Sequence, residues 1–124
     1  MEYSGTNKLP AFNRYCKTLS LKDDAQLIAD YKKVHAAGAA WPEITQGMRE
    51  VGIVDMEIYI LGTRLFMIMD TVADFDHNRA MTELAKKPRQ GEWEAYVSRF
   101  QQTSEEATAD EKWQLMERIY KMDK

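Results

Sequence analysis

The sequence predicts an α+β domain in which an antiparallel sheet carries helices on one face. Three observations support this class. Apolar and polar residues alternate over residues 54–61 and, after a Gly-Thr turn, the chain continues into the apolar run RLFMIMDT, which is typical of a hairpin. Residues 27–35 instead repeat apolar positions at steps of three and four, which indicates a helix. The length of 124 residues fits one domain spanning residues 1–124.

The N-terminal part is expected to form one strand leading into a helix. Residues 1–10 are predicted to be a loose, flexible leader. Residues 12–21 alternate and predict a half-buried strand. The stretch from Ser20 to Asp23 resembles a capping box, so the first helix is expected to begin there. We expect that helix to end at Gly38.

The centre of the chain is expected to hold a second helix and the hairpin. Pro42 suits the first turn of this helix, where its missing N–H has no consequence, and Gly52 ends it. The hairpin follows, and the few polar residues in RLFMIMDT predict a second strand that is buried on both faces.

The C-terminal half is predicted to contain two further helices and a last strand. The helices cover residues 74–87 and 90–101, and residues 102–112 form a polar connector. The end of the chain, residues 113–123, fits a strand, although a helix would also accept its pattern. Merging each pair of helices gives the order βαββαβ, the ferredoxin-like arrangement. One sheet face stays open, so we expect a homodimer that stacks two sheets into a dimeric α/β barrel.

Composition excludes several classes of partner. With 30% charged and 44% hydrophobic residues the chain is expected to fold, and its net charge of −3 without a basic stripe argues against nucleic acid. Cys16 is the single cysteine, which fits a reducing cytoplasm. The polar N-terminus predicts no signal peptide, and the longest apolar run is too interrupted to cross a membrane.

The candidate catalytic group is His35. The sequence has no phosphate loop, HExxH motif or calcium loop, so we expect neither a cofactor nor a metal. Of the two histidines, His77 is expected on the surface at a helix start. His35 shares a helical face with Tyr31, and an imidazole can both donate and accept a proton near neutral pH. The alternative is a histidine that only caps the C-terminus of its helix. We expect its face to point toward the open sheet face.

Aromatic residues supply a candidate binding surface. The flat indole of Trp93 suits the apolar face of a sugar ring. Glu92 beside it is expected to be exposed, although it could accept hydrogen bonds from sugar hydroxyls. The alternative for Trp93 is plain core packing. Met56 and the other methionines of the hairpin are also expected as core filler.

Taken together, these segments resemble the L-rhamnose mutarotase family along nearly the whole chain. The resemblance rests on their joint order: YKKVH (31–35), WPEI (41–44), Gly52-Ile53 followed by EIYI (57–60), RLFMIMD (64–70) and QGEWEAY (90–96).

The resemblance implies a dimeric ferredoxin-like barrel and an isomerase that interconverts the α and β anomers of a deoxy sugar. It implies that His35 is catalytic, with Tyr31 binding the sugar and sharing in proton transfer, and that Trp93 packs on the substrate. Mutarotation opens and recloses a hemiacetal without redox chemistry, so it requires no cofactor or metal. General acid–base catalysis contributes about 10²–10⁴-fold to such a step.

Three departures from the family pattern touch substrate contacts. The five residues AAGAA (36–40) separate the histidine from Trp-Pro-Glu, where the family has three. Met56 replaces a tyrosine, and Glu92 takes the first place of a Trp-Trp pair. Met56 and Glu92 are therefore candidate substrate contacts, and the sugar is expected to be L-rhamnose or L-fucose.

Two other functions fit a small dimeric ferredoxin-like barrel. One is a ligand-binding protein or cofactor-free monooxygenase with an apolar ligand, and the other is a purely structural dimer module. An apolar ligand needs a mainly apolar pocket, whereas a sugar needs hydrogen-bonding groups around an aromatic surface.

Overall fold

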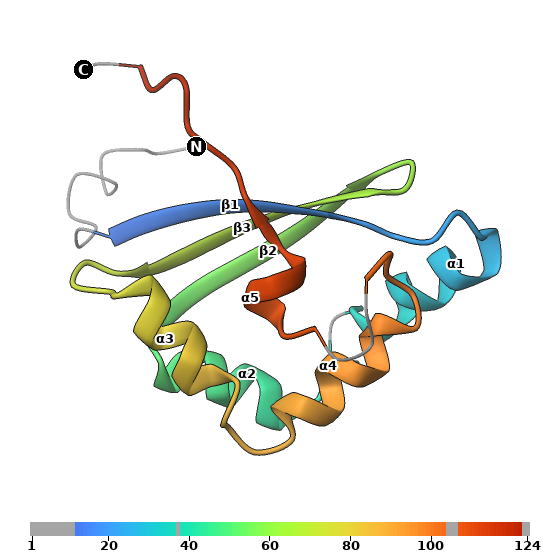
Figure 1. Ribbon diagram of the computed structural model, residues 1–124, viewed down its shortest axis with the longest axis horizontal. Coiled ribbons are helices and arrows are strands. Elements are labelled where there is room, and N and C mark those ends of the chain that lie inside the picture. The colour runs from blue at the N-terminus through green and yellow to red at the C-terminus, as the bar shows by residue number, and fades with distance from the viewer. Residues whose placement is uncertain (1–11, 37, 104–106, 123–124) are drawn as a thin grey trace.

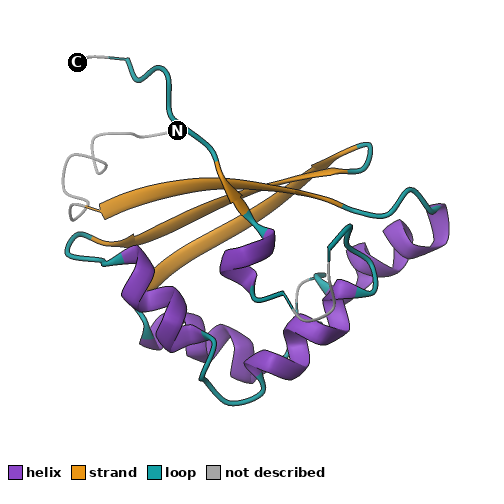
Figure 2. Ribbon diagram, viewed as in Figure 1, coloured by secondary structure: helices purple, strands orange, loops and turns teal. Residues whose placement is uncertain are grey.

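A four-stranded antiparallel sheet carries all the helices of the described chain on one face (Figures 1 and 2). The structure is a computed structural model and describes residues 12–36, 38–103 and 107–122. The predicted leader, residues 1–10, lies outside this part. The elements are β1 (Phe12–Ser20), α1 (Ala25–Val34), α2 (Pro42–Glu50), β2 (Ile53–Leu61), β3 (Arg64–Val72), α3 (His77–Leu84), α4 (Gln90–Ser98), α5 (Ala109–Lys112) and β4 (Gln114–Leu115). The strand order β2-β3-β1-β4 confirms the ferredoxin-like arrangement.

The hairpin of β2 and β3 and the pairing of β1 with β3 build most of the sheet. Gly62 has a φ of +60°, which suits a two-residue hairpin turn. β1 pairs with β3 along its whole length, from Phe12 opposite Val72 to Ser20 opposite Arg64. The predicted hairpin is therefore confirmed.

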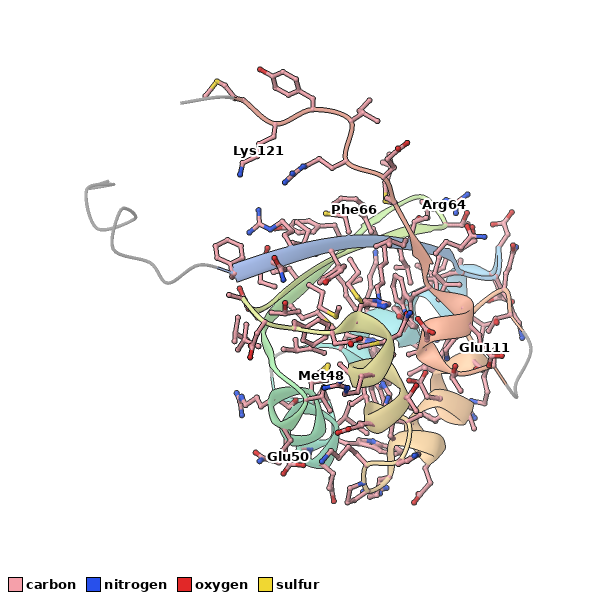
Figure 3. The ribbon with its side chains drawn as sticks, turned by 60° about the vertical axis from the view of Figure 1, so that its left-hand side comes forward. Met48, Glu50, Arg64, Phe66, Glu111 and Lys121 are labelled. Carbon is pink, nitrogen blue, oxygen red and sulfur yellow. The ribbon has the colours of Figure 1, made fainter. Side chains whose placement is uncertain are left out.

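Only one face of β3 is fully buried, so the prediction of burial on both faces was wrong. Side chains of a strand point alternately to opposite faces, and here the helices cover one face alone. The residues beneath the helices are Leu65, Met67, Met69 and Thr71. Phe66 and Ile68 face the other way and stay half-buried, and Figure 3 shows Phe66 on the side away from the helices. This uncovered side is called the open face below.

A side-chain cap marks the start of the first helix, and a proline marks the start of the second. Asp24, and not Ser20, caps α1, because its side chain accepts hydrogen bonds from the N–H groups of Gln26 and Leu27. Ser20 is still part of the strand, so the predicted capping box was wrong. The helix ends at Val34, before Gly38. The predicted start of α2 at Pro42 is confirmed.

The C-terminal half contains the two predicted helices in shorter form, and one that was missed. α3 and α4 lie within the predicted ranges. The predicted polar connector, of which residues 104–106 lie outside the described part, contains α5. Thr108 and Glu111 form a capping box at its start, which stabilises this single turn. The turn directs Lys112 into the protein.

The predicted last strand is confirmed only over two residues. Gln114 and Leu115 pair with β1, and the N–H of Met116 donates to the carbonyl of Cys16 at 2.7 Å. The chain then leaves the sheet on the side opposite the helices (Figure 1). This tail, residues 116–122, exposes Ile119 (90%) and Tyr120 (76%).

Candidate functional site

A cavity lies between the helices and the covered face of the sheet. Its volume is about 130 Å³, and β-strand residues form its floor while all five helices, α1 to α5, contribute to its walls. An outer hollow of about 350 Å³ adjoins it and shares His35 and Met56 with it. The sequence led us to expect His35 to point toward the open sheet face. That expectation was wrong, because α1 packs on the opposite, covered face.

His35 is held at the end of α1 by a bond to its own helix. Its Nδ1 atom lies 2.9 Å from the carbonyl oxygen of Tyr31. A carbonyl only accepts, so Nδ1 carries the proton and Nε2 keeps its lone pair. Burial lowers the pKa of His35, and the bond to Tyr31 opposes this only in part. The imidazole is therefore neutral at pH 7 and able to accept a proton.

Tyr31 lies one turn earlier, and its ring is tilted by 33° against the imidazole with ring centroids 4.2 Å apart. The side chain is almost fully buried at 3% exposure. Its hydroxyl oxygen is 3.3 Å from Nε2 of Gln101, which donates to it. Burial raises the pKa of Tyr31 to about 12. Tyr31 is thus a protonated phenol in the cavity wall.

Three aromatic side chains form a cluster that begins at this wall with Trp93. Trp93 meets His35 edge-on at 5.5 Å between ring centroids and meets Trp41 at 5.2 Å. Tyr96 stacks on Trp41 at 5.7 Å. Trp93 lines the cavity with 8% exposure, so it packs in the core and borders the cavity at once. The guanidinium of Arg89 covers Trp41 from outside at 4.1 Å.

A buried ionic network borders the cavity beside Tyr31. The side chain of Lys112 is fully buried, and its Nζ lies 2.9 Å from Glu94 Oε1 and 2.8 Å from Gln101 Oε1. Glu94 also accepts a bond of 2.6 Å from Gln90. Sequence reasoning missed these residues. One signal was present: Gln90, Glu94, Ser98 and Gln101 are spaced by four, four and three, which places them on one side of a helix.

Lys17 is a second buried cation that the sequence did not predict. It lines the cavity with 3% exposure, and the nearest hydrogen-bonding atom found for its Nζ among the described residues is Met81 Sδ at 3.9 Å. Burial lowers the pKa of Lys17, while the charge of Asp110 acts against this shift. The lysine adds a polar group to an otherwise methionine-rich floor.

The structure brings together four of the five residues predicted for the site. Tyr31, His35, Met56 and Trp93 all line the cavity. Glu92 does not, because it projects from the exposed side of α4, where its carboxylate lies 3.6 Å from Arg89. His77 opens α3 as expected, but it is half-buried, 5.0 Å from the ring of Tyr15.

The described residues contain neither a cluster of metal ligands nor a membrane-spanning helix. No three side chains among His, Cys, Asp and Glu gather as metal ligands within residues 12–36, 38–103 and 107–122. In the same ranges, no helix has the length and apolar character needed to cross a membrane.

A sequence model of the L-rhamnose mutarotase family matches residues 14–122, and the chain belongs to that family. Mutarotases are isomerases that interconvert sugar anomers. The resemblance inferred from the ordered segments of the sequence is thereby confirmed.

Individual proteins are similar to this chain over most of its length. The chain is 36% identical to an L-fucose mutarotase of Xanthomonas campestris over 110 residues, covering 89% of this chain and 88% of the relative. It is 34% identical to a UPF0734 protein of Dictyostelium discoideum over 118 residues, covering 90% and 91% of the two chains. The crystal structure of an L-rhamnose mutarotase from Formosa agariphila matches with a TM-score of 0.63 at 16% identity, covering 90% and 99%.

Proposed function

We propose that this mutarotase acts on a 6-deoxyhexose, L-fucose or L-rhamnose, with His35 as the catalytic proton donor and acceptor. The observation that carries the proposal is the neutral imidazole with a free Nε2 in the cavity wall. Two of the three similar proteins named above are an L-fucose and an L-rhamnose mutarotase, which supports these two sugars as substrates.

The reaction needs one group to accept a proton and one to supply it. His35 Nε2 takes the proton from the anomeric hydroxyl while a proton passes to the ring oxygen, which breaks the bond between the anomeric carbon and that oxygen. The open aldehyde rotates, and reversal of both transfers closes the ring on its other face. Tyr31, a protonated phenol beside His35, is placed to supply or relay the second proton.

The cavity suits a small ligand with both polar and apolar surface. Its volume of about 130 Å³ is below the roughly 300–1,000 Å³ of drug-sized sites. Tyr31, Gln101 and Glu94 offer hydrogen-bonding groups. Trp93 supplies the aromatic surface and Met56 apolar contact, which suits the methyl group of a deoxy sugar. Most of the remaining lining is apolar, which also suits the apolar ligand of the alternative function, so a measurement of anomer exchange distinguishes the two.

The assembly that we propose is a homodimer formed through the open face. Ile68 and Phe66 lie half-buried there, with Tyr59 exposed at 54%, on a sheet face that no described helix covers. The exposed apolar tail, residues 116–122, leaves the sheet on the same side. A second copy would bury both features. We also propose a cytoplasmic location, because the single Cys16 has no partner for an intrachain disulfide.

The test is the rate of anomer exchange measured by saturation-transfer NMR. The protein should accelerate exchange of L-fucose, L-rhamnose or both well above the buffer rate. L-Galactose is the matched control, because it is L-fucose with a hydroxyl at C6, and it should react more slowly. If neither deoxy sugar exchanges faster than in buffer, the proposed function fails.

A further inference from the structure

The buried ammonium of Lys112 fixes the direction of every hydrogen bond around it. An ammonium group has three N–H donors and no acceptor. Its neighbours are Glu94 Oε1 at 2.9 Å, Gln101 Oε1 at 2.8 Å, and Ser98 Oγ and the backbone carbonyl oxygen of Glu94, both at 3.2 Å. The side chain is fully buried, so water cannot replace these partners. Each neighbour must therefore present an oxygen lone pair to Lys112.

This requirement orients the amide of Gln101. Its oxygen must face Lys112, and its NH₂ group must then point the opposite way, toward the hydroxyl of Tyr31 at 3.3 Å. Gln101 is 1% exposed, so no solvent competes for either end. The flipped amide would reverse the bond to Tyr31 and set two donors against each other at Lys112. The repulsion beside the buried ammonium makes the flip strongly unfavourable.

The same requirement assigns the proton of Tyr31. Because the hydroxyl oxygen accepts from Gln101, its own hydrogen is directed to a different partner. The described residues provide no hydrogen bond in which this hydroxyl donates, and the side chain lines the cavity. The free proton is thus available to a ligand oxygen.

We propose that Lys112 and Gln101 are positioning residues that hold the hydroxyl of Tyr31 as a proton donor toward the sugar. The inference rests on the proposed function and adds a division of labour to it. His35 accepts a proton at Nε2, and the phenol one turn away donates. The two groups share a wall of the cavity, and separate hydrogen bonds, to a backbone carbonyl and to a side-chain amide, set their opposite roles.

Gln101→Glu is the discriminating variant because it keeps the shape and reverses one bond. A carboxylate still accepts from Lys112, and that cation favours its ionised form. At its other oxygen it can only accept, so it takes the proton of Tyr31 away from the sugar. We expect kcat for anomer exchange to fall by about 10²-fold or more, the usual contribution of a general acid, with little change in KM.

Gln101→Met and Gln102→Glu are the matched controls. Gln101→Met removes both bonds and lets the phenol rotate toward the sugar, so kcat should fall less than in Gln101→Glu. Gln102→Glu adds the same charge at the neighbouring, exposed position and should leave kcat unchanged. A merely structural role for Gln101 gives the reverse order, because Gln101→Glu would still hold Lys112. Equal or higher activity of Gln101→Glu relative to Gln101→Met overturns the proposal.

A second readout separates this inference from the proposed function. NMR of tyrosines labelled at Cζ, with Tyr31→Phe for assignment, reports whether the phenol accepts or donates. The Tyr31 signal should shift in Gln101→Glu and stay in place in Gln102→Glu. If wild-type protein exchanges no sugar, the proposed function fails, and this spectrum still decides the hydrogen-bond direction. An unshifted Tyr31 signal in Gln101→Glu contradicts the inference.

Discussion

The Nδ1 atom of His35 lies 2.9 Å from the carbonyl oxygen of Tyr31, so the catalytic candidate is oriented by the last turn of its own helix. Through this bond the imidazole caps a free carbonyl at the C-terminus of α1. The same bond leaves Nε2 as a proton acceptor. Helix capping and proton transfer, the two alternatives that the sequence left open for His35, are therefore compatible in one side chain.

The pH dependence of activity should follow this neutral imidazole. Burial lowers the pKa of His35 below its ordinary value of 6.5, so the acceptor form exists above that lowered pKa and disappears as the pH falls through it. A pH–rate profile of kcat/KM should show an acid limb with its midpoint below 6.5. A midpoint above 6.5 would show that another group, or a charged His35, controls the reaction.

The same pKa shift predicts how stability changes with pH. The unfolded chain binds a proton on this histidine near pH 6.5, whereas the folded protein does so only at lower pH. The free energy of unfolding should therefore decrease as the pH falls from about 6.5 toward the pKa of the folded state. Burial also lowers the pKa of His77, so urea unfolding of His35→Ala should retain part of this dependence. A pH dependence that His35→Ala leaves unchanged would speak against a buried, neutral His35.

Trp93 should contribute to sugar binding, and Trp41 should not. Trp93 borders the cavity. Trp41 lies behind Trp93, with ring centroids 5.2 Å apart, and the guanidinium of Arg89 covers it. A well-placed aromatic contact is worth about 0.5–1.5 kcal/mol, so Trp93→Phe should raise KM by roughly 2- to 10-fold. Trp41→Phe is the control and should change KM little. Equal effects of the two variants on KM would show that Trp93 acts through general packing.

Removing one partner of the ion pair between Lys112 and Glu94 should destabilise the protein more than removing both. Lys112→Met leaves Glu94 charged and nearly buried, which typically costs about 3–5 kcal/mol of unfolding free energy. Adding Glu94→Gln should recover a large part of that loss in urea unfolding. The exposed pair of Arg89 and Glu92 is the control, and Glu92→Ala should cost no more than about 1 kcal/mol. A similar cost for Lys112→Met and Glu92→Ala would contradict the buried network.

The open face should decide the oligomeric state. Phe66→Glu places a charge in the middle of this face, so sedimentation should change from a dimer to a monomer. Lys86→Glu, on the helix side of the molecule, changes charge without touching the open face and should sediment as wild type. A wild-type protein that sediments as a monomer at every concentration would exclude the proposed dimer.

The sequence predicted those features that depend on local spacing. Tyr31 and His35 lie four residues apart in a helical pattern, and the structure places them together as that spacing requires. The order of strands and helices followed from hydrophobic periods of two and of three to four. The false capping box at Ser20 shows the limit, because Asp24 offers a better cap a few residues later.

The buried charges depend on contacts between distant segments, which no local pattern reveals. Lys112 occurs in a polar stretch typical of a surface loop, but a single turn of α5 directs it against Glu94 of α4. Lys17 occupies a strand position whose side chain points to the covered face of the sheet. Its burial was not predicted because lysine is rarely buried. The covered sheet face became the site because the helices pack on it, a choice that spacing along the chain does not determine.

The most direct test of the account compares His35→Ala with His77→Ala in anomer exchange of L-fucose and L-rhamnose. Both variants remove an imidazole, but only His35 lines the cavity among the described residues. The account predicts that His35→Ala lowers the exchange rate by about 10²–10⁴-fold at pH 7.5, while His77→Ala stays near the wild-type rate. Exchange by folded His35→Ala at the wild-type rate would contradict the assignment of His35 as the catalytic group.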